Sequence, residues 1–154
     1  MYTELHARSA FSFLEGASLP EELVATCKDY GMASMALLDR DGVYGAPRFY
    51  LAAKKIEMRA HIGAEVTSVA GWRYPLLVKS REGYQNLCRL ITKMKLRAPK
   101  GKGSVSGAEV AEFSNGLVCL TGGEEGPLAH ALAQGGIESG MECVRRWASV
   151  RSFQ

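Results

Sequence analysis

Apolar positions divide the first 66 residues into short runs and amphipathic stretches. Runs with the length of strands lie at residues 2–6, 35–38 and 61–66. Two stretches between them repeat apolar residues at helical spacing. One opens at Ser18 with a Ser-x-x-Glu capping pattern, and the other covers residues 46–57. This order predicts a β-α-β-α-β segment, in which each crossover helix joins two parallel strands with a right-handed connection.

The following elements depart from this alternation. Residues 74–78 form another apolar run, and only a few residues, including Gly71, separate it from the strand before it. A parallel crossover needs a dozen or more residues, so we expect this run to fold back as an antiparallel hairpin partner. A third helix begins after Ser80, and one of its faces carries the apolar residues Tyr84, Leu87, Cys88, Ile91 and Met94.

The last third of the chain returns to strand and helix patterns. Residues 96–106 contain two glycines and a proline without apolar periodicity, which predicts an exposed loop. Residues 117–121 predict a buried strand, residues 127–134 and 137–147 predict helices, and residues 149–154 carry no clear signal. The pattern therefore divides the chain into three sections, at residues 1–66, 67–106 and 107–154.

These elements predict an α/β fold with mostly parallel strands and one antiparallel hairpin. A complete (β/α) barrel usually needs at least ~200 residues, whereas this chain has 154. We therefore expect an open α/β sheet or an incomplete barrel that belongs to a larger domain. An incomplete barrel leaves unpaired strand edges and apolar surface, so we also expect self-association or a partner that covers the open side.

Composition agrees with a folded domain, and the charge is unevenly distributed. The chain is 47% hydrophobic and 23% charged, which excludes wholesale disorder. The formal net charge is only +3, but residues 79–102 hold eight basic residues against one acid. Such a segment is either a solvated helix face or a surface that contacts the phosphate backbone of DNA. Its candidate contact residues are Arg89, Lys93, Lys95, Arg97, Lys100 and Lys102.

Cysteine usage and hydropathy predict a cytoplasmic protein without a membrane partner. The four cysteines are scattered and form no Cys-x-x-Cys pair, which disfavours a zinc ribbon and predicts reduced thiols. No apolar run approaches the ~20 residues that span a bilayer. The first residues also lack the pattern of a signal peptide.

Three predicted strand ends carry side chains that suit a metal ion. These are His6, Asp39 and Glu65, and imidazole and carboxylate groups bind zinc, manganese or iron. Arg8 and Arg40 lie beside them and argue against an ion, because a guanidinium group is always charged and cannot act as a ligand. We therefore hypothesise a neutral cluster in which the two arginines pair with Asp39 and Glu65. The alternative is that both arginines point to solvent.

Five segments, in order and spacing, resemble one family. They cover most of residues 2–120 and read ELHARSAFSFLEGASLPEELV (4–24), ALLDRDGVYG (36–45), HIGAEV (61–66), YPLLVKSREGYQNLCRLIT (74–92) and RAPKG (97–101). They resemble the N-terminal polymerase and histidinol phosphatase (PHP) domain of bacterial DNA polymerase III alpha subunits, and the error-prone type in particular. The resemblance implies a distorted (β/α) barrel that, in active members, holds up to three metal ions.

This sequence departs from the motifs of the active members. The family's His-x-His motif is His6-Ala7-Arg8 here, and its Asp-His motif is Asp39-Arg40, while the Glu of its third motif is retained as Glu65. The family's later His and Asp ligands, and its polymerase core, lie beyond the matched residues. The resemblance thus implies a truncated or split PHP portion, with two histidine ligands replaced by arginine.

The leading expectation is a non-catalytic scaffold of an error-prone DNA polymerase, which acts in DNA replication or repair synthesis and braces the polymerase core. The parent protein would be a DNA-directed DNA polymerase, a nucleotidyltransferase. One alternative is a PHP phosphoesterase or 3′–5′ exonuclease. Another is a small nucleic-acid-binding module that uses residues 93–102. No cofactor is expected for the scaffold, whereas an active enzyme would use zinc, manganese or magnesium.

Overall fold

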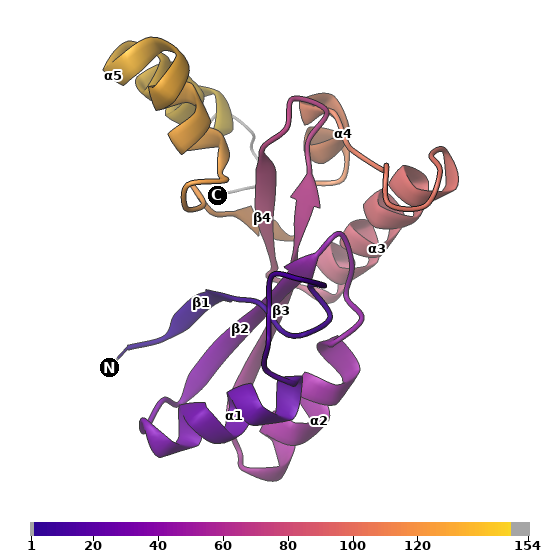
Figure 1. Ribbon diagram of the computed structural model, residues 1–154, viewed down its shortest axis with the longest axis vertical. Helices are drawn as coiled ribbons and strands as arrows, with labels where there is room; N and C mark the ends of the chain where they lie inside the picture. Colours follow the sequence, from indigo (N-terminus) through magenta and orange to yellow (C-terminus); the bar gives the residue numbers. More distant parts are fainter. Residues whose placement is uncertain (1, 149–154) are drawn as a thin grey trace. The chain divides into compact units, whose positions relative to one another are not determined.

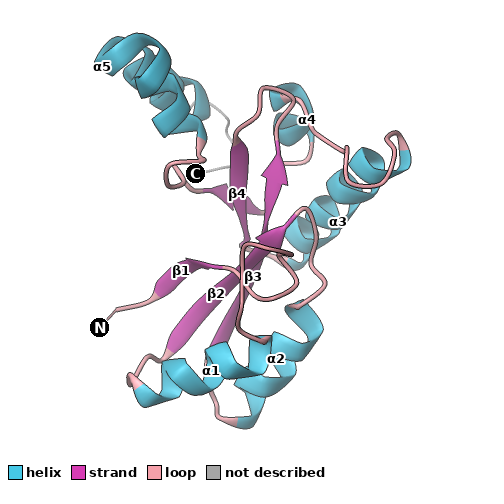
Figure 2. Cartoon of the chain, viewed as in Figure 1, coloured by secondary structure: helices cyan, strands magenta, loops and turns pink. Residues whose placement is uncertain are grey.

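The computed structural model describes residues 2–148, so residues 149–154, where the sequence gives no clear signal, lie outside the described residues. Five strands lie in one sheet in the order β1-β2-β3-β4-β5 (Figures 1 and 2). In chain order the elements are β1 (Glu4–Ala7), α1 (Pro20–Asp29), β2 (Ser34–Arg40), α2 (Ala46–Lys55), β3 (Arg59–Thr67), β4 (Arg73–Val78), α3 (Arg81–Leu96), α4 (Gly107–Glu112), β5 (Leu117–Cys119) and α5 (Pro127–Ala148). The α/β class with mostly parallel strands is confirmed.

The chain divides into two compact units, Met1–Ala64 and Glu65–Gln154. In the first unit, β1 pairs in parallel with β2, and Ala7 lies opposite Leu37. The predicted β-α-β-α-β order is confirmed, because α1 and α2 follow β1 and β2 as crossover helices.

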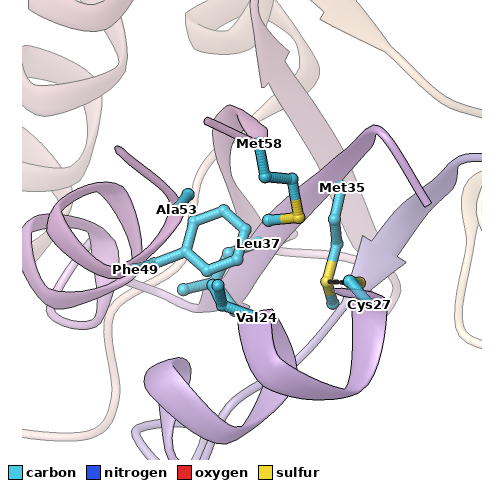
Figure 3. Packing of buried hydrophobic residues seen from close by; sticks show 7 residues of the cluster. All are labelled: Val24, Cys27, Met35, Leu37, Phe49, Ala53 and Met58. Atoms are coloured by element: carbon cyan, nitrogen blue, oxygen red, sulfur yellow. Dashed lines mark hydrogen bonds between the residues drawn. The ribbon is translucent and has the colours of Figure 1, made fainter. Parts of the chain in front are cut away.

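The core of the first unit lies between its two helices and strand β2. Figure 3 shows Phe49 of α2 packed in this core, together with Val24, Cys27, Met35, Leu37, Ala53 and Met58. The Cys27 thiol lies 3.0 Å from the Met35 sulfur, and burial raises the pKa of this thiol. This cysteine is therefore a core residue, as expected for a reduced and unreactive thiol.

Helix α1 begins later than the capping pattern predicts. Its first residue is Pro20 and its N-cap is Leu19, not Ser18. The Glu22 carboxylate accepts a hydrogen bond from the Leu19 backbone N–H at 2.7 Å, which satisfies one of the donors left open at a helix start. The acid one residue further along the chain thus sets the start of the helix.

Strand β3 ends in the second unit, where residues 68–72 join it to its neighbour β4. The turn between them is closed by a hydrogen bond from the Ser68 N–H to the Trp72 carbonyl at 2.8 Å, so the predicted hairpin is present. Strand β5 pairs antiparallel with β4. Helix α3 is capped by the Ser80 side chain, which accepts from the Gly83 N–H at 3.1 Å, as predicted.

The end of the second unit contains one unpredicted helix and one kinked helix. Helix α4 lies directly after the predicted loop, where Ser106 and Glu109 form a capping box that the sequence analysis overlooked. Helix α5 corresponds to the two predicted helices. Its backbone leaves helical geometry at Gly135 and Gly136, with φ of 64° at Gly136, so two helical arms meet at a kink.

Candidate functional site

Asp39, near the end of β2, is a buried carboxylate surrounded by hydroxyl and amide donors. Its side chain accepts from the Ser9 N–H at 2.8 Å and from the Ser12 hydroxyl at 2.8 Å. The Ser9 hydroxyl lies 2.9 Å from each carboxylate oxygen. Asp39 is 1% exposed, and both serines are equally buried. The carboxylate therefore fixes the loop after β1 to the end of β2.

The two arginines of the predicted cluster meet at Glu15. Arg40 Nη1 lies 2.6 Å from one oxygen of the Glu15 carboxylate, and Arg8 Nη1 lies 3.5 Å from the other. Arg40 Nε also lies 3.6 Å from Asp41. The alternative in which both arginines point only to solvent is therefore wrong.

The predicted pairing of an arginine with Asp39 is also wrong. Within residues 2–148, the hydrogen-bond partners of this carboxylate are Ser9 and Ser12. The short serine side chains satisfy a carboxylate that is closed off from solvent, whereas the long Arg40 side chain is 42% exposed and reaches outward to Glu15. Burying an arginine beside Asp39 would have required desolvation of a second charge.

Glu65 belongs to the second unit and pairs there with Arg73. This carboxylate is 1% exposed, and Arg73 Nη1 lies 3.6 Å from its Oε2. The same guanidinium nitrogen lies 3.1 Å from Glu125. Arg73 is thus a positive partner that the sequence analysis missed. Pairing of Glu65 with Arg8 or Arg40 stays a prediction.

His6 lies on β1, and its backbone N–H donates to the Glu4 carboxylate at 2.8 Å. The parallel register places the end of β1 beside β2, two residues before Asp39. His6 and Asp39 therefore lie at neighbouring strand ends of the first unit. A metal site formed by His6, Asp39 and Glu65 stays a prediction.

The basic segment is partly neutralised by acids of α4. Arg97 is hydrogen-bonded to Glu109 through both of its terminal nitrogens and to the Ser104 carbonyl. Lys93 lies 3.1 Å from Glu112 and 3.7 Å from Glu109. The predicted contact residues Arg89, Lys93, Lys95, Arg97, Lys100 and Lys102 are all exposed. Their contact with DNA stays a prediction, and Lys93 and Arg97 already have acidic partners within the described residues.

The Arg97–Glu109 pair predicts a pH-dependent contribution to stability. Hydrogen bonds from Arg97 and from the Ser106 backbone lower the pKa of Glu109 to about 2 from its ordinary value of 4.5. A lowered pKa in the folded state stabilises the fold above pH 4.5, and this contribution is lost as pH falls toward 2.

We expect Glu109→Gln to lower the free energy of unfolding by about 1 kcal/mol at pH 7, because a solvent-screened pair is worth about that much. The same substitution should have almost no effect at pH 2. Urea unfolding at the two pH values measures this difference, and Glu124→Gln is the matched control on an exposed acid. An equal effect of Glu109→Gln at both pH values would contradict the assignment.

Sequence reasoning missed Ser9, Ser12 and Glu15, which complete the geometry around Asp39 and Arg40. Their signal is their place in the loop that follows the first strand, where β/α folds gather functional side chains. A serine in such a loop suggests a nucleophile. Its use as a hydrogen-bond donor to a carboxylate on the next strand is harder to predict from the sequence.

None of the helices in the described part of the chain is both long and apolar enough to cross a membrane.

A family model described as "PHP domain" matches residues 4–152. A curated error-prone DNA polymerase from Mycobacterium bovis is 40% identical over 147 residues, which cover 88% of this chain and 14% of that protein. The error-prone DNA polymerase of Dechloromonas aromatica is 46% identical over 100 residues, 65% of this chain and 10% of that protein.

The chain thus spans a small part of the length of the curated relatives it matches. Among solved structures, an amidohydrolase from Chromobacterium violaceum matches with 16% identity and a TM-score of 0.48, over 97% of this chain and 56% of that one.

Proposed function

The chain belongs to the PHP domain family, and we propose that it acts as a non-catalytic scaffold in an error-prone DNA polymerase. In this proposal it braces the polymerase core instead of hydrolysing phosphoesters. The similarity to the corresponding part of error-prone polymerases supports the choice of partner.

One observation carries the proposal: Asp39, Arg8 and Arg40 all make contacts that hold the fold together. Both carboxylate oxygens of Asp39 accept hydrogen bonds from buried serines. Arg8 and Arg40 occupy the positions at which the family's active members have histidine ligands, and both pair with Glu15. A divalent cation would have to displace the serine hydroxyls and tolerate two guanidinium groups. These contacts support the proposal that Asp39, Arg8 and Arg40 do not form the metal cluster of active PHP domains.

A strained and exposed apolar loop supports an interaction surface in the first unit. Phe13 is 80% exposed and Leu14 is 90% exposed. Leu14 also has a φ of 65°, a left-handed conformation that costs a branched side chain about 1 kcal/mol or more. A residue that is both exposed to water and strained gains nothing for the fold of this chain, whereas burial against a partner would offset the cost.

We expect Leu14→Asn to stabilise the isolated chain by about 0.5–1 kcal/mol, because asparagine tolerates the left-handed conformation. The same substitution should weaken binding to the polymerase core at least tenfold by removing an apolar contact. The measurement is titration of the chain with the Mycobacterium bovis relative from which the matching region has been removed. Tyr30→Asn, at another exposed apolar residue, is the control and should leave binding unchanged.

Two results would contradict the proposal. The first is the absence of any complex between the chain and that polymerase. The second is hydrolysis of a phosphodiester in the presence of added manganese or zinc that is lost in His6→Gln, which would favour a PHP phosphoesterase or exonuclease. Salt-sensitive binding of single-stranded DNA without binding to the polymerase would favour the nucleic-acid-binding module.

A further inference from the structure

The second unit contains a cavity of about 390 Å³ that the proposed scaffold function does not use. Its walls come from the β3–β4 hairpin, the first residue of α4 and both arms of the kinked helix α5. The volume falls within the range of small-molecule sites, which begins at about 300 Å³. The kink at Gly135 and Gly136 brings residues from both arms of α5 to the same cavity.

Four rings line this cavity and form a continuous series. The ring centroids of His130 and Trp72 are 4.5 Å apart, those of Trp72 and Tyr74 are 6.3 Å apart, and those of Tyr74 and Trp147 are 5.0 Å apart. These residues come from three separate segments of the chain, so no local pattern in the sequence marks the series. Tyr74 is buried, so the partly exposed rings of Trp72, His130 and Trp147 provide the surface on which a flat ligand can stack.

Polar groups at the cavity indicate which kind of flat ligand fits. The indole nitrogen of Trp72 is buried and has no hydrogen-bond acceptor within residues 2–148, and an indole N–H can only donate. Because Trp72 lines the cavity, an acceptor on the edge of a bound ligand would satisfy this donor.

The Arg146 guanidinium group brings positive charge to the part of the cavity wall that Gly107 forms. A methyl group at Gly107 would lie 3.7 Å from the Arg146 guanidinium, 3.5 Å from the Tyr74 hydroxyl and 3.9 Å from the Trp147 ring. Three side chains thus converge where the glycine leaves space. A guanidinium group at this place suits an anionic group on the ligand.

We propose that this cavity binds a nucleoside monophosphate unit, either free or within single-stranded nucleic acid. The base stacks on the aromatic series, a carbonyl or ring nitrogen of the base accepts from Trp72, and the phosphate pairs with Arg146. An aromatic carboxylate would fill the stacking surface and the anion position, but it lacks the acceptor on its ring edge that Trp72 requires.

The two tryptophans of the chain both line the cavity, so intrinsic fluorescence reports on it directly. Titration of the full chain with deoxyadenosine monophosphate should give saturable quenching, whereas ribose 5-phosphate at equal concentration should not. Benzoate, which lacks the acceptor for Trp72, should bind at least tenfold more weakly than the monophosphate. A five-nucleotide deoxyadenosine oligonucleotide distinguishes the two sources. Equal affinity for the monophosphate and the oligonucleotide indicates a free nucleotide, and tighter binding of the oligonucleotide indicates a single strand.

Two substitutions test the contacts separately. Trp72→Phe keeps a ring but removes the donor, and it should weaken binding about tenfold, as expected for one lost hydrogen bond. Gly107→Leu places a side chain in the cavity and should abolish the saturable quenching. Gly107→Ala is the matched control, because the added methyl group makes only ordinary contacts at 3.5 Å or more. Circular dichroism of each variant verifies that the fold is retained.

The proposal fails if neither the monophosphate nor the oligonucleotide quenches the fluorescence, or if ribose 5-phosphate does so equally well. It also fails if oligonucleotide binding is unchanged in Trp72→Phe and Gly107→Leu and is lost in Lys100→Ala and Lys102→Ala, which would place the contact on the basic segment. These outcomes are independent of binding to a polymerase core, which tests the proposed scaffold function.

Discussion

Replacing Asp39 by alanine is expected to lower the free energy of unfolding by about 3 kcal/mol. The substitution removes the acceptor for the Ser9 N–H and for the Ser9 and Ser12 hydroxyls, all within 2.9 Å of the carboxylate. These donors are buried, so water does not replace the lost acceptor, and each unsatisfied buried donor costs about 1–3 kcal/mol. Urea denaturation followed by circular dichroism measures the change.

Asparagine at the same position is the matched variant for this test. Asp39→Asn keeps the shape and one carbonyl oxygen, and a serine hydroxyl can accept from the new amide group. Its cost should therefore be about 1 kcal/mol, clearly smaller than that of alanine.

A double-mutant cycle between Asp39→Ala and Ser12→Ala should give a coupling of about 1 kcal/mol or more, since the two groups are 2.8 Å apart. If alanine costs less than about 0.5 kcal/mol, the carboxylate does not hold the loop after β1 in place and is available as a ligand.

Local patterns in the sequence predicted most of the elements, because these patterns depend on neighbours a few residues apart. The alternation of apolar runs and helical periodicity identified β1, α1, β2, α2 and β3 in order. The short connection before β4 required a hairpin, and the glycines between the two predicted C-terminal helices coincide with the kink of α5. Recognition of the PHP family from five motifs is confirmed by the family match over residues 4–152.

The partners of the site residues could not be predicted in the same way. Asp39 carries no local mark that distinguishes a metal ligand from a carboxylate bound by Ser9 and Ser12. Those contacts depend on how the loop after β1 folds over β2. The sequence predicted that arginines would pair with acids, but Glu15 competes for Arg40 from a loop whose path it does not specify. The aromatic series likewise forms only when α5 packs beside the β3–β4 hairpin.

Alanine in place of Gly83 is expected to destabilise the second unit by about 3 kcal/mol or more. Gly83 lies in the first turn of α3, where its backbone approaches that of Gly116 so closely that a Cβ would lie 1.8 Å from the Gly116 carbonyl oxygen. Backbone cannot move aside as a flexible side chain can. That carbonyl also accepts a hydrogen bond from the Lys79 N–H at 2.9 Å. The extra methyl group must therefore separate α3 from the segment that leads into β5.

The sign of this effect makes it diagnostic. Glycine to alanine within a helix ordinarily gains about 1 kcal/mol of stability, so a large loss at Gly83 can come only from the close approach of the two backbones. Two control variants separate the causes. Gly123→Ala, in open space without a left-handed φ, should be nearly neutral, and Gly71→Ala, in open space with a φ of 96°, should show only the conformational cost of about 1 kcal/mol.

Urea unfolding followed by tryptophan fluorescence measures all three variants in the second unit, because Trp72 and Trp147 both lie there. A gain in stability for Gly83→Ala would mean that α3 and the segment before β5 do not contact each other through their backbones. The fixed position of α3 beside β4 and β5 would then need another explanation. A loss of about 3 kcal/mol in the free energy of unfolding of Gly83→Ala, with Gly123→Ala unchanged, shows that the contact between Gly83 and Gly116 fixes the position of α3.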